Sequence, residues 1–205
     1  MKTRKTVSFI SLLLVTLLFC TGCELRQKAE YITDHEGKDK SRNYVVYEGV
    51  FLNKDDVLAV AEKIRGSNPA YDKTVTEFHV TTHFLPDLTY KEVYGQNVTV
   101  HVVGYKAGEV KMEDGKITHN EALEVELESN DPLMKYCLFH SQEGWHVTLS
   151  YEDKAFYSNT MDYSDAQKVD YTLTGVYGAY LNGNFVSYNP NDVDTLISEV
   201  SSPSK

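Results

Sequence analysis

Two stretches of this 205-residue chain are built alike: residues 77–84 read EFHVTTHF and residues 144–151 read GWHVTLSY. Each contains the tripeptide His-Val-Thr, with an aromatic residue just before the histidine and another five residues after it. Runs rich in Val, Thr and aromatic residues favour β-strands. Because side chains alternate between the two faces of a strand, His79 and Thr81 are expected on one face, and likewise His146 and Thr148.

This pair of His-x-Thr strands resembles the signature of the 2H phosphoesterases, which include plant and yeast cyclic nucleotide phosphodiesterases and bacterial 2′-5′ RNA ligase-like proteins. The resemblance implies an α+β fold that is bilobal and pseudo-symmetric, with antiparallel sheets and flanking helices around a central cleft. It implies His79 and His146 as the catalytic acid and base, in an order left open, and Thr81 and Thr148 as phosphate-binding residues.

The implied chemistry is hydrolysis of a cyclic or 2′-5′ linked nucleotide phosphate. Two imidazoles near their ordinary pKa of about 6.5 can share the acid and base roles at neutral pH, so neither a metal nor another cofactor is expected. The threonine hydroxyls can donate hydrogen bonds to phosphate oxygens, and a protonated histidine adds positive charge where negative charge builds. Cyclic mononucleotides, short 2′-5′ linked oligonucleotides, ADP-ribose cyclic phosphate and cyclic dinucleotides all suit this chemistry, and the sequence does not choose among them.

Other residues near the two tripeptides are weaker candidates for the functional site. Phe84 and Tyr151 occupy matching positions and could stack on a base, although packing is the alternative for both. By strict alternation His83 shares the face of His79 and could flank the cleft. A metal-dependent hydrolase using His79, His83 and a distant acid is another alternative, but no carboxylate or third histidine has recognisable ligand spacing.

The beginning of the chain predicts export. Lys2, Arg4 and Lys5 precede an apolar run, 7–19, which is too short for a membrane-spanning helix and typical of a signal peptide. The following residues, CTGC at 20–23, resemble a bacterial lipobox with Cys23 as the lipid-bearing residue, although Cys20 stands where Leu is usual. We therefore expect a lipid anchor in a bacterial membrane with the domain facing outward; an ordinary cleaved signal peptide is the alternative.

The composition along the chain predicts four segments. Residues 1–22 are the expected signal peptide, 23–43 a polar tether, 44–190 the 2H phosphoesterase-like domain and 191–205 a C-terminal tail. A hydrophobic content of 41% is enough for a core, and Cys137, the one cysteine outside the leader region, is expected to be buried in it. The formal net charge of −10 and the lack of a basic stripe favour a small nucleotide or short oligonucleotide substrate over long nucleic acid. A monomer is expected.

Local patterns predict alternating strands and helices. Asn53 can cap a helix over 54–65 that ends at Gly66, and Asn130 or Asp131 can cap a second helix from Pro132 to about residue 140. Asn-Gly at 182–183 predicts a hairpin. The expected strands are 44–51, 74–84, 97–105, 122–128, 145–151, 169–181 and 184–188, with a helical turn near 165–168.

A function from another class also fits these features. The chain could be a non-catalytic surface lipoprotein that binds a ligand or a protein partner, with the two His-x-Thr tripeptides occurring by chance. The spatial relation of His79, Thr81, His146 and Thr148 discriminates between the two readings. In the catalytic reading these four side chains converge on one cleft with room for a phosphate.

Overall fold

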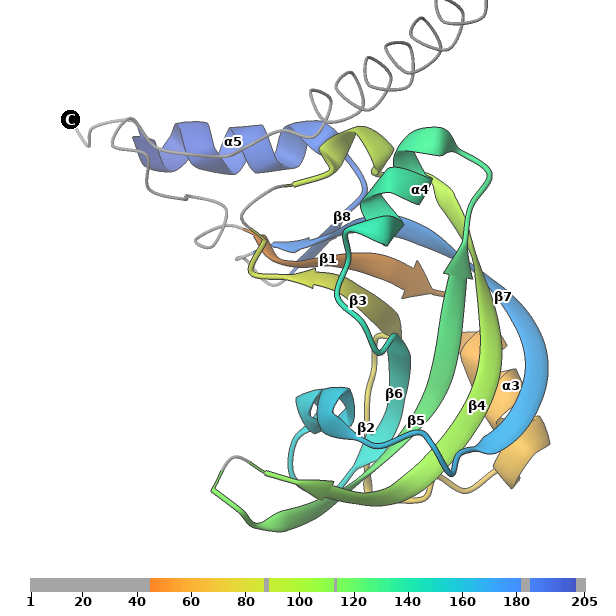
Figure 1. Cartoon of the computed structure of the whole chain (residues 1–205). Helices are drawn as coiled ribbons and strands as arrows, with labels where there is room; N and C mark the ends of the chain where they lie inside the picture. Colours follow the sequence, from red (N-terminus) through yellow and green to blue (C-terminus); the bar gives the residue numbers. More distant parts are fainter. Residues whose placement is uncertain (1–44, 87–88, 113, 182–184, 202–205) are drawn as a thin grey trace, which may run out of the picture.

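The computed structural model describes residues 45–86, 89–112, 114–181 and 185–201, in which strands and helices alternate (Figure 1). The expected signal peptide, Cys23 and the tether lie outside the described residues. No helix in the described part of the chain is long and apolar enough to cross a membrane. The elements are β1 Val45–Leu52, α3 Lys54–Arg65, β2 Lys73–Thr74, β3 His79–Phe84, the 3-10 helix η1 Lys91–Val93, β4 Asn97–Lys111, β5 Ile117–Glu128, α4 Pro132–Phe139, β6 His146–Tyr151, the 3-10 helix η2 Ala155–Thr160, β7 Gln167–Leu181, β8 Phe185–Ser187 and α5 Pro190–Ser201.

The described strands form one antiparallel sheet in the order β2-β6-β5-β4-β7-β1-β3, and β8 pairs with β7 beside this path. The long strands β4, β5 and β7 bend around one side of the molecule, and the sheet curls until β3 and β6 contact each other (Figure 1). The predicted α+β class is confirmed. Where two sheets were expected, the strands of the described residues belong to a single curled sheet.

Both predicted helices begin at their predicted caps. The Asn53 side chain accepts hydrogen bonds from the amides of residues 55 and 56 at 2.9 and 3.2 Å. The Asp131 side chain does the same for the amides of residues 133 and 134 at 2.9 and 2.8 Å, with Pro132 in the first turn. These contacts satisfy amides that have no partner inside the helix. At the end of α3, Gly66 has a φ of 87°, a conformation that glycine adopts without strain.

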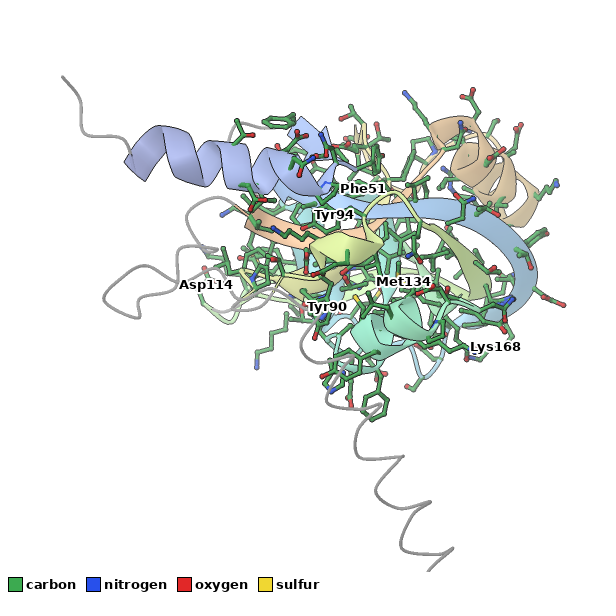
Figure 2. The ribbon with its side chains drawn as sticks, turned by 90° about the horizontal axis from the view of Figure 1, so that it is seen from above. Phe51, Tyr90, Tyr94, Asp114, Met134 and Lys168 are labelled. Atoms are coloured by element: carbon green, nitrogen blue, oxygen red, sulfur yellow. The ribbon has the colours of Figure 1, made fainter. Side chains whose placement is uncertain are left out.

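Helices α3 and α4 pack against the same hydrophobic core. Val57, Val60 and Ala61 of α3 enter it, as do Met134 and Cys137 of α4. Met134 and Tyr90, both labelled in Figure 2, are buried in this core. Cys137 is fully buried, as predicted. The sheet face that meets α3 and α4 is called the core face below, and the other is called the outer face.

Several boundaries differ from expectation. The strands expected at 97–105 and 122–128 are longer, since β4 runs on to Lys111 and β5 begins at Ile117. The predicted strand 74–84 is divided into β2 and β3, and the helical turn expected near 165–168 is replaced by the start of β7, while η2 forms earlier. The hairpin residues 182–183 lie outside the described residues, but the flanking strands β7 and β8 pair antiparallel. Most of the expected tail is helix α5, which buries Val193 in the core and is joined to η1 by an ion pair between Lys91 and Asp194.

Candidate active site

The two His-x-Thr strands, β3 and β6, pair with their neighbours in the same register. The partner of β3 is β1, and the partner of β6 is β5; each pair is joined through a helix, α3 or α4. The matched cross-strand pairs are Tyr47–Phe84, Glu48–His83, Gly49–Thr81, Val50–Val80 and Phe51–His79 in the first half, and Asn120–Tyr151, Glu121–Ser150, Ala122–Thr148, Leu123–Val147 and Glu124–His146 in the second.

Both strands also contain a β-bulge at the same position. Thr82 is the extra residue in β3 and Leu149 is the extra residue in β6, each directly after the threonine of the tripeptide. A bulge places two residues opposite one, so the alternation of side chains shifts by one position beyond it. The expectation that His83 shares the face of His79 is therefore wrong. His83 points to the core face, opposite Glu48, whereas His79 stays on the outer face.

The curl of the sheet brings the two histidines together. β3 and β6 contact each other. The pKa of His79 is lowered mainly by burial and further by the charge of a protonated His146, so the two rings lie within electrostatic reach. Both imidazoles are half-buried. Figure 1 shows β3 and β6 next to each other where the two ends of the sheet meet, and the outer faces of these strands carry His79 and His146.

Aromatic side chains surround His79. The Tyr47 ring stacks on the imidazole at 4.6 Å between centroids, and the Tyr47 hydroxyl lies 3.4 Å from His79 Nδ1. Phe51, its cross-strand partner, lies 5.9 Å away between centroids. Burial lowers the pKa of His79 to about 4, although a hydrogen bond to the Glu77 carbonyl opposes the shift. His79 is therefore neutral at pH 7.

His146 has a related but more polar environment. Its Nδ1 lies 2.9 Å from the carbonyl oxygen of Gly144, so Nδ1–H donates and Nε2 is left as the basic nitrogen. The Tyr163 ring lies 6.4 Å away between centroids, and Glu124 is the cross-strand partner. Burial lowers the pKa of His146, and the hydrogen bond to Gly144 opposes this. In both tripeptides the histidine therefore bonds a carbonyl two residues earlier, Glu77 or Gly144.

The expectation that both histidines titrate near 6.5 is wrong for the ligand-free protein. Both pKa values are lowered because the rings are partly removed from water, which disfavours the charged form. If one of these histidines acts as a general acid, a nearby negative charge must raise its pKa so that the imidazole is protonated at neutral pH. The phosphate of a bound substrate would supply such a charge.

The side chains of the two threonines have different surroundings. Thr81 is half-buried beside His79 on the outer face. The Thr148 hydroxyl donates to the Ala155 carbonyl of η2 at 3.3 Å, a long bond that a stronger acceptor can replace. Phe84 is 62% exposed and Tyr151 is half-buried. Both lie about 15 Å along their strands from the histidines, so they do not reach the same phosphate.

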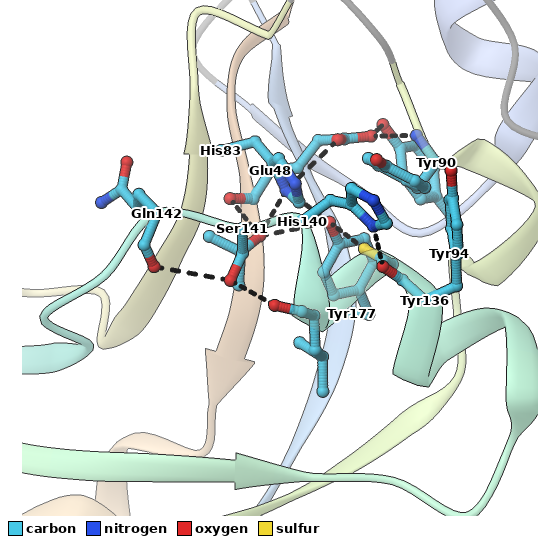
Figure 3. Close-up of polar contacts among 12 residues, drawn as sticks. Glu48, His83, Tyr90, Tyr94, Tyr136, His140, Ser141, Gln142 and Tyr177 are labelled. Atoms are coloured by element: carbon cyan, nitrogen blue, oxygen red, sulfur yellow. Dashed lines mark hydrogen bonds and ion pairs between the residues drawn. The ribbon is translucent and has the colours of Figure 1, made fainter. Parts of the chain in front are cut away.

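On the core face, behind His79, lies a buried polar cluster (Figure 3). Glu48 is fully buried, and its Oε1 accepts hydrogen bonds from the Tyr90 amide at 2.8 Å and the Tyr94 hydroxyl at 2.7 Å. Its Oε2 has no hydrogen-bond partner within the described part of the chain and lies 3.9 Å from His83 Nδ1. The Tyr177 hydroxyl lies 3.3 Å from the same nitrogen. Burial raises the pKa of Glu48 to about 7, while the two hydrogen bonds oppose the shift.

Glu121 occupies the matching position in the second half but has a cation. It pairs with Arg65 from the end of α3, and Tyr105 donates to it at 3.0 Å. Ser150, which matches His83 in register, also donates to Glu121. Among the described residues, the same register therefore holds a carboxylate paired with a guanidinium in one half and a carboxylate that faces the His83 imidazole in the other.

Several of these neighbours were missed from the sequence. Tyr47 and Tyr163 contact the two histidines. Phe84 and Tyr151, for which stacking on a base and packing were both open, make no ring contact with either histidine among the described residues. A signal was present for Glu48, the one acidic residue in the otherwise largely apolar strand β1, but not for Glu121, which is one of four glutamates in β5. The position of Tyr163 in a loop offered no pattern.

Comparisons with protein-family models, with curated proteins and with solved structures find no match to this chain. Within the described ranges, no three His, Cys, Asp or Glu side chains are grouped as metal ligands. The bulge at Thr82 also separates His83 from His79, which removes the metal site that these two residues could have formed.

Proposed function

We propose that the protein is a metal-independent phosphodiesterase of the 2H type, which hydrolyses a cyclic or 2′-5′ linked nucleotide phosphate through His79 and His146. The observation that carries this proposal is the repeated register. Two His-x-Thr strands have the same pairing and the same bulge, and they meet with both histidines on the outer face. A chance pair of tripeptides would have no reason to share all three features.

The same observation supports a pseudo-symmetric origin for the domain. Each half has the order strand, helix, His-x-Thr strand, 3-10 helix and long strand, and β2 is the one described strand between β1 and β7 outside this repeat. Each strand of one half has a counterpart in the other: β1 corresponds to β5, β3 to β6 and β4 to β7. When each strand is replaced by its counterpart, the sheet order β6-β5-β4-β7-β1-β3 becomes the same order read backwards. We therefore infer two related lobes joined through β4 and β7, with the cleft where β3 and β6 meet.

The proposed reaction uses the two histidines in turn. One neutral imidazole takes a proton from the attacking water, and the water oxygen forms the new bond to phosphorus. The other, as imidazolium, gives its proton to the ribose oxygen as the bond between phosphorus and that oxygen breaks. The hydrogen bonds to Glu77 and Gly144 fix the orientation of the rings, which keeps both nitrogens aimed during the two transfers.

The substrate itself helps to prepare the site. Both histidines are neutral in the free protein at neutral pH, whereas the reaction needs one of them protonated. A bound phosphodiester brings one negative charge into a partly dehydrated site and raises the pKa of the imidazole beside it. Thr81 and Thr148 can then donate to the non-bridging oxygens, the latter by giving up its long bond to Ala155.

The N-terminal pattern adds a location to the proposal. A lipid on Cys23 and a polar tether of about twenty residues would hold the domain outside the membrane, where an acidic surface favours small anions over long RNA. The leader and Cys23 lie outside the described residues, so this part rests on the sequence.

A panel of 2′,3′-cyclic nucleotides and short 2′-5′ linked oligonucleotides tests the activity, with each reaction run in EDTA. We expect hydrolysis of a 2′,3′-cyclic phosphate to leave the phosphate on the ribose 2′ oxygen. His79→Ala and His146→Ala should each lose roughly 10²–10⁴-fold in rate. The matched control is His101→Ala, because His101 lies on an exposed part of β4 and pairs with Glu128 at 3.0 Å. Binding of these nucleotides without turnover would favour the non-catalytic lipoprotein instead.

A further inference from the structure

A surface pocket of about 430 Å³ lies beside His146, between the end of α4 and the paired strands β5 and β6. We call it the α4 pocket. Its volume is in the range of small-molecule sites. Its walls include the apolar side chains Leu138, Phe139, Trp145 and Tyr163 and the carboxylates Glu124 and Glu143.

The α4 pocket and the surroundings of His146 share several residues. Gly144 and Trp145, which line the pocket, are the two residues directly before the histidine, and the Gly144 carbonyl accepts its Nδ1–H. Tyr163 lines the pocket and also stacks on the imidazole at 6.4 Å between centroids. Glu124 is both a lining residue and the cross-strand partner of His146. A molecule with its phosphate at His146 can therefore extend into this pocket.

Hydrogen bonds hold the Trp145 side chain of the pocket wall in place. The Trp145 indole N–H donates to Ser141 Oγ at 3.1 Å, and this hydroxyl donates to the Leu138 carbonyl at 2.7 Å. The Gln142 amide donates to the Thr82 carbonyl at 2.9 Å, which ties the loop after α4 to β3. Phe139 at the rim is 84% exposed, an unusual position for a large apolar ring unless it contacts a ligand.

The charges of the α4 pocket select against a second phosphate. No Lys or Arg is among its lining residues, and both charged side chains are acidic. Glu124 already has a cation, since Lys168 Nζ lies 3.3 Å from its Oε2. Glu143 is exposed, and within the described part of the chain it makes no ion pair or side-chain hydrogen bond. Its carboxylate is therefore free to accept hydrogen bonds from a ligand.

From this combination we propose that the α4 pocket binds the base of the substrate nucleotide and prefers guanine. The flat apolar walls suit a purine ring. Among the common bases, guanine presents two adjacent N–H donors on its Watson–Crick edge, at N1 and N2, which a carboxylate such as Glu143 can accept together. The inference deepens the proposed function and rests on it for the position of the phosphate. It names the substrate class as a guanosine mononucleotide cyclic phosphate.

Trp145 provides a direct binding signal, because it is the single tryptophan of the chain and lines the pocket. The experiment follows the tryptophan fluorescence of the full chain in detergent during titration with guanosine 2′-monophosphate and, separately, adenosine 2′-monophosphate. We expect quenching by both, with the guanine compound bound at least about tenfold more tightly, the discrimination of one bidentate base contact. Glu143→Gln should remove this preference, and Phe139→Ala should weaken both nucleotides.

The matched control is Ile117→Ala, since Ile117 is 61% exposed but stands at the start of β5, seven residues along the strand from the lining residue Glu124. It should leave both titrations unchanged. Equal affinity for the two nucleotides in the unmodified chain, or a guanine preference that survives Glu143→Gln, would overturn the proposal.

The same samples separate this inference from the proposed function. Cyclic phosphates hydrolysed without any change in Trp145 fluorescence would remove the pocket assignment and leave the histidine mechanism standing. A guanine-selective signal that depends on Glu143, in a protein that hydrolyses none of the cyclic nucleotides, would support the pocket and remove the catalytic proposal.

Discussion

Replacing Glu48 by Gln should make the protein more stable above neutral pH. Glu48 is fully buried, its Oε2 has no hydrogen-bond partner among the described residues, and its pKa is raised to about 7. The neutral acid is therefore the form that the fold accommodates. Gln has the same shape, and its carbonyl oxygen can keep the hydrogen bonds from Tyr90 and Tyr94.

The sign and size of the effect follow from the shift in pKa. A carboxyl whose folded pKa is above its unfolded value of 4.5 contributes stability that is fully present below about pH 4.5 and is lost as pH rises through about 7. A shift of this size corresponds to about 3 kcal/mol at pH 8. Glu48→Gln should exceed the unmodified protein by only about 1 kcal/mol near pH 5 and by up to about 3 kcal/mol at pH 8. For a domain of this length that is about 6–10 °C in Tm.

The second half of the domain supplies the control. Glu121 has the same register position but pairs with Arg65, so Glu121→Gln leaves a mostly buried guanidinium without its partner. We expect this variant to lose about 3 kcal/mol at both pH values. Urea unfolding of the three proteins at pH 5, 6, 7 and 8 measures the difference. If Glu48→Gln is destabilised at pH 8 as much as Glu121→Gln, the Glu48 carboxylate is accommodated as an ion and the reasoning fails.

Three further predictions concern the outer face and the anchor. The pH profile of kcat/KM should be a bell with its maximum below about pH 6.5, because burial lowers the pKa of both His79 and His146; a maximum at pH 8 would exclude them as the titrating pair. Thr81→Ala should reduce kcat by about tenfold, less than either histidine variant, because it removes one hydrogen bond to the phosphate; equal losses would assign it a larger role. Cys23→Ala should release the protein from the membrane fraction, as measured by fractionation and by loss of metabolic lipid labelling.

The sequence predicted local structure well where the signal was itself local. Asn53 and Asp131 accept hydrogen bonds from nearby amides, so cap and helix are separated by two or three residues and the pattern is complete within one turn. The His-Val-Thr runs are strands for the same reason. The face that each side chain takes beyond the threonine could not be predicted, because a bulge is a property of two paired strands, and the partner is set by the fold.

His83 was expected on the wrong face because the bulge could not be predicted from the sequence. Strict alternation puts it beside His79, whereas the extra residue Thr82 turns it into the core opposite Glu48. The aromatic neighbours of the histidines were hidden in a similar way. Tyr47 reaches His79 from β1, and Tyr163 reaches His146 from the segment after η2, so neither contact has a fixed spacing in the sequence.

The paired bulges connect the two faces of the domain. In each half the residues before the bulge place a histidine and a threonine on the outer face, and the first residue after it places a polar side chain, His83 or Ser150, against a buried glutamate. Without the extra residue, that polar side chain would lie outside and the carboxylate would lose its neighbour. A bulge also resists sliding of the strand, because a shift by one residue would move every side chain to the wrong face. The buried glutamates and the outer histidines therefore depend on the same local geometry, which explains why two strands that differ in most of their remaining contacts have the bulge in the same place.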